Sequence, residues 1–179
     1  TSHLFTRDVF CFWEDRGEVR MQLKPHAPGI RKFSEQALTA KARTIIKSMR
    51  ASKDSGKAVM FYSCIIGSIP GQTATAIKVA DTFVRSLRER LDQVFIINPA
   101  EYFEPGMDGD DLMFMWEQVQ RSGLINIWRF QSMEDIEASF GLMGLKVPPV
   151  WSGKDATFST GCTKEMRIAL DMQRSHPEL

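Results

Sequence analysis

The sequence predicts a single α/β domain, a three-layer sandwich whose mixed sheet starts with an N-terminal β-hairpin and continues in mostly parallel strand–helix units. Three observations predict this fold. A near-continuous apolar run at residues 58–66 is typical of a strand buried on both faces. A short glycine loop leads from this run into a helical pattern at 73–91. Apolar runs and amphipathic stretches then alternate along the remaining chain, as in a helix-covered parallel sheet.

The first elements are predicted from periodicity and turn chemistry. Residues 8–14 and 18–23 alternate apolar and polar side chains, and the segment 15–17 between them ends in glycine, so we expect a hairpin. Ser34 is the expected cap of a helix over 34–51, in which apolar residues recur at the spacing of one buried face.

The second half of the chain predicts further strand–helix units. A capping pattern at Ser132 and Asp135 predicts one helix start, and Ser159 or Thr160 is expected to cap the closing helix, which extends to about residue 174. A helix is also expected over 110–122. The remaining strands are expected at 93–97, at 124–130 and, as an edge strand because of its prolines, at 145–151.

Composition is that of one globular domain. The chain has 179 residues, of which 43% are hydrophobic and 25% charged, and we expect residues 1–179 to form a single domain. Because the chain begins with Thr1, we expect a domain cut from a larger protein. Three cysteines without metal-type spacing indicate reduced thiols and a cytoplasmic location. No apolar stretch approaches the roughly 18 residues of a membrane span, so none is expected.

Charge is distributed unevenly although the net charge is only +1. Residues 16–57 contain eleven basic and three acidic residues, a net charge of +8, whereas residues 92–140 contain ten acidic and two basic residues, a net charge of −8. Arg43, Lys47 and Arg50 should form a basic stripe on one helix face. The first functional hypothesis is therefore a non-catalytic regulatory or partner-binding domain that associates with a protein partner, or with itself, through charged faces. No nucleic-acid motif accompanies the stripe, so no nucleic-acid partner is predicted.

The alternative hypothesis is a small-anion or nucleotide site at the carboxyl ends of the parallel strands, where open α/β sheets form their crevice. The loop from Gly67 to Gly71 resembles no complete phosphate motif, because Gln72 stands where a Walker A loop needs lysine. A tight structural connection is the competing interpretation of this loop. The residues expected to reach the ligand are Ser68, Gln72, Thr73, Asn98, Arg129, Thr160 and Lys164.

A third hypothesis is a thiol-dependent enzyme that uses Cys162. A helix start and the nearby Lys164 would both favour the thiolate. Nothing orients a histidine toward this thiol as a general base, so an incidental buried cysteine is the competing interpretation.

No other pattern predicts catalysis. The acidic cluster at 108–111 is expected to cap a helix rather than to hold a metal ion. The diagnostic residues of Rossmann-like, receiver-like and sulfur-relay folds are missing at the required spacing. We therefore expect no cofactor and no metal, and the sequence favours a protein that is not an enzyme.

Overall fold

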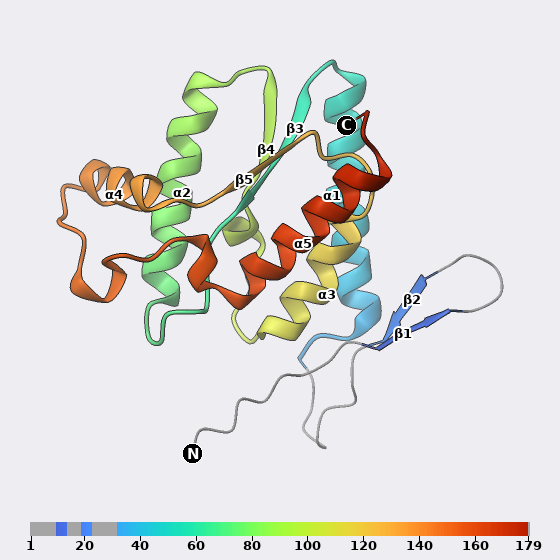
Figure 1. Ribbon diagram of the computed structural model, residues 1–179, viewed down its shortest axis with the longest axis horizontal. Helices are drawn as coiled ribbons and strands as arrows, with labels where there is room; N and C mark the ends of the chain where they lie inside the picture. Colours follow the sequence, from blue (N-terminus) through green and yellow to red (C-terminus); the bar gives the residue numbers. More distant parts are fainter. Residues whose placement is uncertain (1–9, 14–18, 23–31, 179) are drawn as a thin grey trace.

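The computed structural model describes residues 10–13, 19–22 and 32–178, and it shows an α/β fold (Figure 1). No helix within these residues is long and apolar enough to cross a membrane. Five α-helices follow one another along the chain: α1 (Glu35–Asp54), α2 (Thr73–Arg90), α3 (Gly109–Gln120), α4 (Met133–Leu142) and α5 (Thr160–Ser175). Three short 3₁₀ helices lie between them: η1 (Pro99–Tyr102), η2 (Pro149–Trp151) and η3 (Ala156–Phe158).

The main sheet has three parallel strands in the order β4–β3–β5. β3 (Ala58–Ser63) lies between β4 (Val94–Ile97) and β5 (Ile127–Phe130), so both of its edges are hydrogen-bonded. Phe61 fixes the register, since it lies opposite Ile97 on one side and Trp128 on the other. The predicted central strand and its parallel neighbours are therefore confirmed.

The N-terminal strands form a separate sheet. β1 (Phe10–Trp13) pairs antiparallel with β2 (Val19–Gln22). The predicted turn at 15–17 lies outside the described residues. Because these two strands do not join the main sheet, the predicted mixed sheet is wrong for the part of the chain that the structure describes. The three-layer sandwich stays a prediction.

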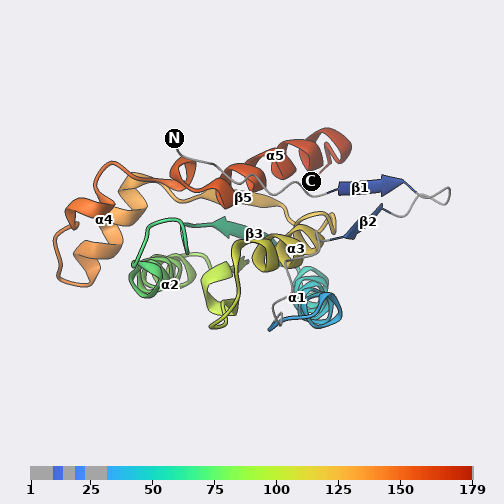
Figure 2. The ribbon, with the colours of Figure 1, turned by 90° about the horizontal axis from the view of Figure 1, so that it is seen from below.

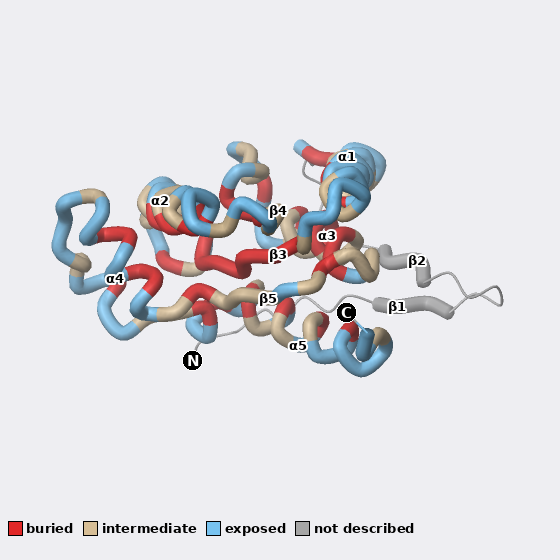
Figure 3. Tube along the Cα trace, turned by 90° about the horizontal axis from the view of Figure 1, so that it is seen from above, coloured by how far each residue is buried: buried red, intermediate tan, exposed pale blue. Residues whose placement is uncertain are grey.

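Helices pack on both faces of β3. Val59 and Phe61 point to one face and pack in a core with α1 and α3, whereas Met60 and Tyr62 point to the other face and pack against α2. Figure 1 shows α2 on one side of the strands and α1 and α3 on the other. As a result, β3 is buried from its second residue to its end, as Figure 3 shows. This burial on both faces explains why the sequence of the strand is almost continuously apolar.

The last two helices extend this arrangement. α4 packs against α2 through Ile136 and Phe140, and the ring of Phe140 meets the indole of Trp151 edge-on with centroids 5.9 Å apart. α5 lies along β5 in Figure 2 and also contacts α3. The start of α5 is thereby held close to the end of β3.

Three of the predicted helix caps are confirmed. Ser34 accepts a hydrogen bond from the backbone of Ala37, and Ser132 forms the predicted reciprocal capping box with Asp135. Ser159 caps α5 by accepting from the backbone N–H of Cys162. Each cap satisfies a backbone donor that the helix itself leaves unpaired.

The strand predicted at 145–151 is wrong. The chain instead forms η2, and Trp151 is buried in the core between α2 and α4. Pro148 and Pro149 have no N–H to donate to a sheet, and Pro149 suits the first position of a helical turn.

Gln131 joins the end of β3 to the segments beside it. Its backbone N–H donates to the carbonyl of Ser63, at 2.9 Å, and its carbonyl accepts from Ala156, at 2.8 Å. Its side-chain oxygen accepts from the backbone N–H of Ile65, at 3.0 Å, where the chain has already left the sheet. The buried Gln131 side chain therefore replaces a missing strand partner.

Replacing Gln131 with Met should lower the free energy of unfolding by about 1–3 kcal/mol, because the buried N–H of Ile65 loses its acceptor while the side-chain volume is kept. Urea unfolding measures the change. Gln36→Met, on the exposed side of α1, is the matched control and should shift stability by less than about 0.5 kcal/mol. Equal effects of the two substitutions would contradict the role of Gln131.

Candidate functional site

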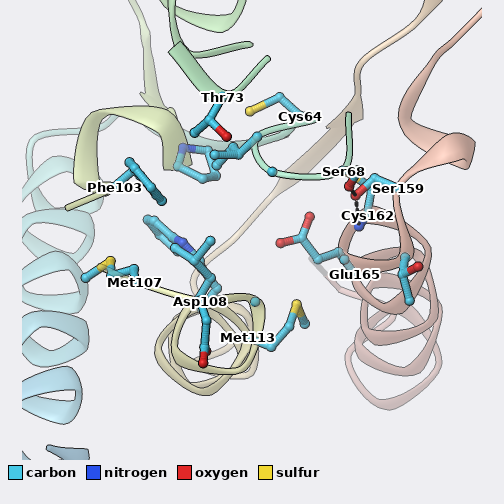
Figure 4. A pocket seen from close by; sticks show the side chains of 18 residues that line it. Cys64, Ser68, Thr73, Phe103, Met107, Asp108, Met113, Ser159, Cys162 and Glu165 are labelled. Atoms are coloured by element: carbon cyan, nitrogen blue, oxygen red, sulfur yellow. Dashed lines mark hydrogen bonds between the residues drawn. The ribbon is translucent and has the colours of Figure 1, made fainter. Parts of the chain in front are cut away.

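A cavity of about 450 Å³ opens where β3 leaves the sheet (Figure 4). Its walls come from the segment after β3, the start of α2, η1 and the loop that follows it, α3, and the start of α5. The carboxyl ends of parallel strands are the usual place for a ligand crevice in an open α/β sheet. The volume lies within the range of about 300–1,000 Å³ that is common for small-molecule sites.

Glu165 is the most unusual residue of this cavity. It is only 7% exposed, and Figure 4 shows its carboxyl group pointing from α5 into the cavity. One carboxyl oxygen accepts a hydrogen bond from the hydroxyl of Ser63, and the other accepts from the side-chain amide of Gln120, at 3.0 Å. Burial raises the pKa of Glu165 to about 7, although both hydrogen bonds act to lower it. A carboxyl group that changes protonation near neutral pH in a cavity is a candidate for function.

No positive charge compensates this carboxyl group within the described residues. Glu165 takes part in no ion pair with them. The described residues that line the cavity include two acidic side chains, Asp108 and Glu165, and no lysine, arginine or histidine. The Asp108 carboxyl group caps α3, so Glu165 is the carboxyl group that faces this largely apolar cavity.

The apolar wall is made of aromatic and thioether side chains, namely Phe103, Met107, Met113 and Trp116. Trp116 is 2% exposed, and its indole N–H has no hydrogen-bond partner among the described residues. Its ring packs edge-on against Phe61 and Tyr102. A buried indole N–H without an acceptor is uncommon in folded proteins.

Two serine hydroxyls close the cavity on the α5 side. The Ser68 hydroxyl donates to that of Ser159 at 2.8 Å, and Ser159 caps α5. Figure 4 shows this pair beside Cys162. The hydrogen bond ties the loop after β3 to the start of α5.

The two cysteines that line the cavity, Cys64 and Cys162, are poorly suited to nucleophilic chemistry. Burial raises the pKa of the Cys162 thiol to about 12, and the charge of Glu165 adds to the effect. Burial, and then the charges of Cys162 and Glu165, raise the pKa of Cys64. Hydrogen bonds with Ser63 and with groups at the start of α5 act to lower the pKa of Cys162, but burial outweighs them.

Three of the seven residues expected at a ligand, Ser68, Thr73 and Thr160, line the cavity. The other four do not. Lys164 is exposed on α5 outside the lining, and the side-chain oxygen of Gln72 accepts from the indole N–H of Trp151 at 3.0 Å.

The remaining two of the seven have structural partners. Asn98 is buried, donates to Asp81 at 2.7 Å and caps η1 by accepting from the backbone of Ala100. Arg129 donates to Asp135 at 2.6 Å and lies over the ring of Phe83. These contacts hold elements together and leave neither side chain in the cavity.

The acidic cluster at 108–111 has a capping contact. Asp108 accepts from the backbone of Asp111, and Asp111 accepts in return from the backbone of Asp108. This is the reciprocal arrangement of a capping box at the start of α3. Within the described residues, no group of three or more His, Cys, Asp or Glu side chains is placed to hold a metal ion.

Glu165 was missed by the sequence analysis, yet a signal for it exists. The buried positions of α5 are Cys162, Glu165, Ile168 and Met172, so a carboxylate occupies the apolar stripe of this helix. A charged residue at a core position requires either burial with partners or a functional reason.

The pKa of Glu165 predicts how stability depends on pH. Because the folded protein holds this proton more tightly than the unfolded chain, stability is highest at low pH and falls as the pH rises from about 4.5 to about 7. The full loss is about 3 kcal/mol, since one pH unit corresponds to about 1.4 kcal/mol. Glu165→Gln removes the titration, so the free energy of unfolding of this variant relative to the wild type should rise by about 2–3 kcal/mol between pH 5 and pH 8.

Urea unfolding at several pH values measures this difference. Glu137→Gln, on the exposed side of α4, is the matched control. The difference between its free energy of unfolding and that of the wild type should not show this dependence on pH. A difference for Glu165→Gln that does not change with pH would show that the carboxyl group titrates normally.

No protein-family model, curated protein or solved structure matches the chain. The geometry and chemistry of the cavity therefore carry the functional proposal.

Proposed function

We propose that this domain binds a small, largely apolar molecule in the cavity at the carboxyl end of its sheet. The observation that carries the proposal is the buried carboxyl group of Glu165, which faces an apolar wall and has no compensating positive charge among the described residues. Keeping an ionisable group in such a place destabilises the fold, and fold stability alone gives no reason for it. A ligand that hydrogen-bonds to the carboxyl group would give a functional reason for its burial.

The lining favours an apolar molecule over the anion or nucleotide that the sequence suggested. Phosphate sites generally use basic side chains or several free backbone N–H groups. The described lining has no basic side chain, and the starts of α3 and α5 are already capped by Asp108 and Ser159. The start of α2 is the feature that favours an anion, because no side chain caps it.

Gly161 offers a direct test of the cavity. A Cβ atom at this position would lie 3.6 Å from the Ser159 hydroxyl oxygen and 3.8 Å from the Met113 sulfur, two atoms of the cavity wall, and both distances are ordinary contacts. A larger side chain would extend into the cavity. Gly161→Leu should therefore abolish binding of small aromatic fragments, whereas Gly161→Ala should keep it.

Ligand-observed NMR with a fragment library measures binding, and circular dichroism checks that both variants are folded. If fragments bind to Gly161→Leu as they do to the wild type, the binding site lies elsewhere. If no fragment binds to the wild type, small-molecule binding is wrong. If only phosphorylated fragments bind, the anion alternative is correct.

Association through the basic face of α1 is a second candidate function. Arg43, Lys47 and Arg50 are all exposed, and none forms an ion pair or a side-chain hydrogen bond with another described residue. Like charges three and four residues apart slightly destabilise a helix, by a few tenths of a kcal/mol per pair. An acidic partner surface, or the acidic part of another copy, would offset this repulsion.

Replacing Arg43, Lys47 and Arg50 together with Glu should leave the fold intact and abolish a salt-sensitive association. Surface charges usually change stability by less than about 0.5 kcal/mol each, so unfolding is not expected. Sedimentation at several salt concentrations measures the association. A triple variant that associates like the wild type, with the same salt dependence, would show that the stripe is only a solvated face.

A further inference from the structure

We propose that the molecule bound in this cavity is a small amine whose ammonium group pairs with Glu165 and whose apolar body lies against the aromatic and thioether wall. This inference rests on the proposed function and adds the chemical class of the ligand. It follows from the charge of the lining, from the free acceptor positions on Glu165 and from the chemistry of the opposite wall.

The charge of the cavity lining favours a cation. Glu165 is the carboxyl group that points into the cavity, and the described lining residues include no lysine, arginine or histidine. In a partly enclosed space of low dielectric, a cation gains from such a lining and an anion is repelled. With an uncharged ligand, burial favours the protonated form of Glu165, whereas a cation favours the carboxylate.

The hydrogen bonds of Glu165 leave room for a donor. Each oxygen of its carboxyl group accepts one hydrogen bond, from Ser63 on one side and from Gln120 on the other. A carboxylate oxygen has two lone pairs, so each oxygen can accept a second bond. Since the group points into the cavity in Figure 4, these positions are open to a donor that lies there, such as a ligand N–H.

The opposite wall suits the rest of such a molecule. The aromatic rings of Phe103 and Trp116 attract a cation that lies over their faces, and the thioethers of Met107 and Met113 adapt to an apolar body.

Affinity for an amine should depend on pH in a defined direction. The titratable groups that face Glu165 are Cys162 on its own helix and Cys64 after β3, whereas the carboxyl group of Asp108 caps α3 and points away from it in Figure 4. Burial raises the pKa of both thiols, so they stay neutral between pH 5.5 and pH 8. An ammonium group selects the ionised form of Glu165, whose pKa is about 7, and affinity should therefore rise about 30-fold over this range.

Matched probes test the proposal. The probes are an amine, an alcohol and a carboxylate, each built on phenyl, naphthyl and cyclohexyl groups, and titration calorimetry or NMR gives their dissociation constants. We expect the amine of at least one set to bind to the wild type at pH 8 more tightly than its alcohol and its carboxylate, and to weaken about 30-fold at pH 5.5. Glu165→Gln should abolish both the preference and the pH dependence. Asp108→Asn, which keeps a capping side chain, should retain both.

The other outcomes are distinct. If the alcohols or carboxylates bind as tightly as the amines, and Gly161→Leu abolishes that binding, the cavity is a ligand site but the amine class is wrong. If the amines bind equally well to the wild type and to Glu165→Gln, the pairing with Glu165 is wrong. If no probe binds to the wild type, the amine proposal is overturned, and the fragment library decides the proposed function separately.

Discussion

Burial of the central strand on every side is the constraint on which the rest of the structure depends. β3 is hydrogen-bonded along both edges, to β4 and β5, and packed on both faces, by α1 and α3 on one side and α2 on the other. No polar backbone group of such a strand can reach solvent, so each needs a protein partner. After Ser63, where strand pairing ends, a side chain supplies the hydrogen-bond partner: Gln131 accepts from the backbone N–H of Ile65.

The polar groups at the end of β3 form one connected system. The side chain of Gln131 accepts from the backbone N–H of Ile65, and its backbone N–H donates to the carbonyl of Ser63. The hydroxyl of Ser63 in turn donates to Glu165. Gln120 completes the system from α3. The end of the strand is thus linked to α3, α5 and the segment after β5 through a carboxyl group that also faces a cavity. A structural requirement and an ionisable group meet at one place, which is how a stable fold can support a chemically specific site.

Much of the fold follows from the sequence because local chemistry and tertiary packing agree. The apolar run of β3, the spacing of α1 and the caps Ser34, Ser132 and Ser159 each predict what forms. Prediction fails where an apolar pattern has more than one outcome. Residues 145–151 have the composition of an edge strand, but their prolines lack donors and Trp151 gains more burial in the core beside Phe140.

The site is predicted less well, for a physical reason. The carboxyl end of the sheet was identified as the place for a ligand, and Ser68, Thr73 and Thr160 do line the cavity there. Asn98 and Arg129 also lie near strand ends, but they do not reach the cavity. Asn98 is hydrogen-bonded to Asp81 on α2, and Arg129 to Asp135 on α4. Each pairing joins two different elements of the fold, and the spacing of the residues in the sequence does not show that they meet. Glu165 needed a different argument, namely a charged residue on the buried stripe of a helix.

The central claim is that Glu165 is a buried carboxyl group whose proton equilibrium is set by the cavity. The most direct measurement is an NMR titration that follows the side-chain carboxyl carbon of Glu165 in uniformly ¹³C-labelled protein, assigned with Glu165→Gln. Burial with two hydrogen-bond donors predicts a midpoint near pH 7. A midpoint close to the ordinary glutamate value of about 4.3 would contradict the account, because the carboxyl group would then be fully hydrated.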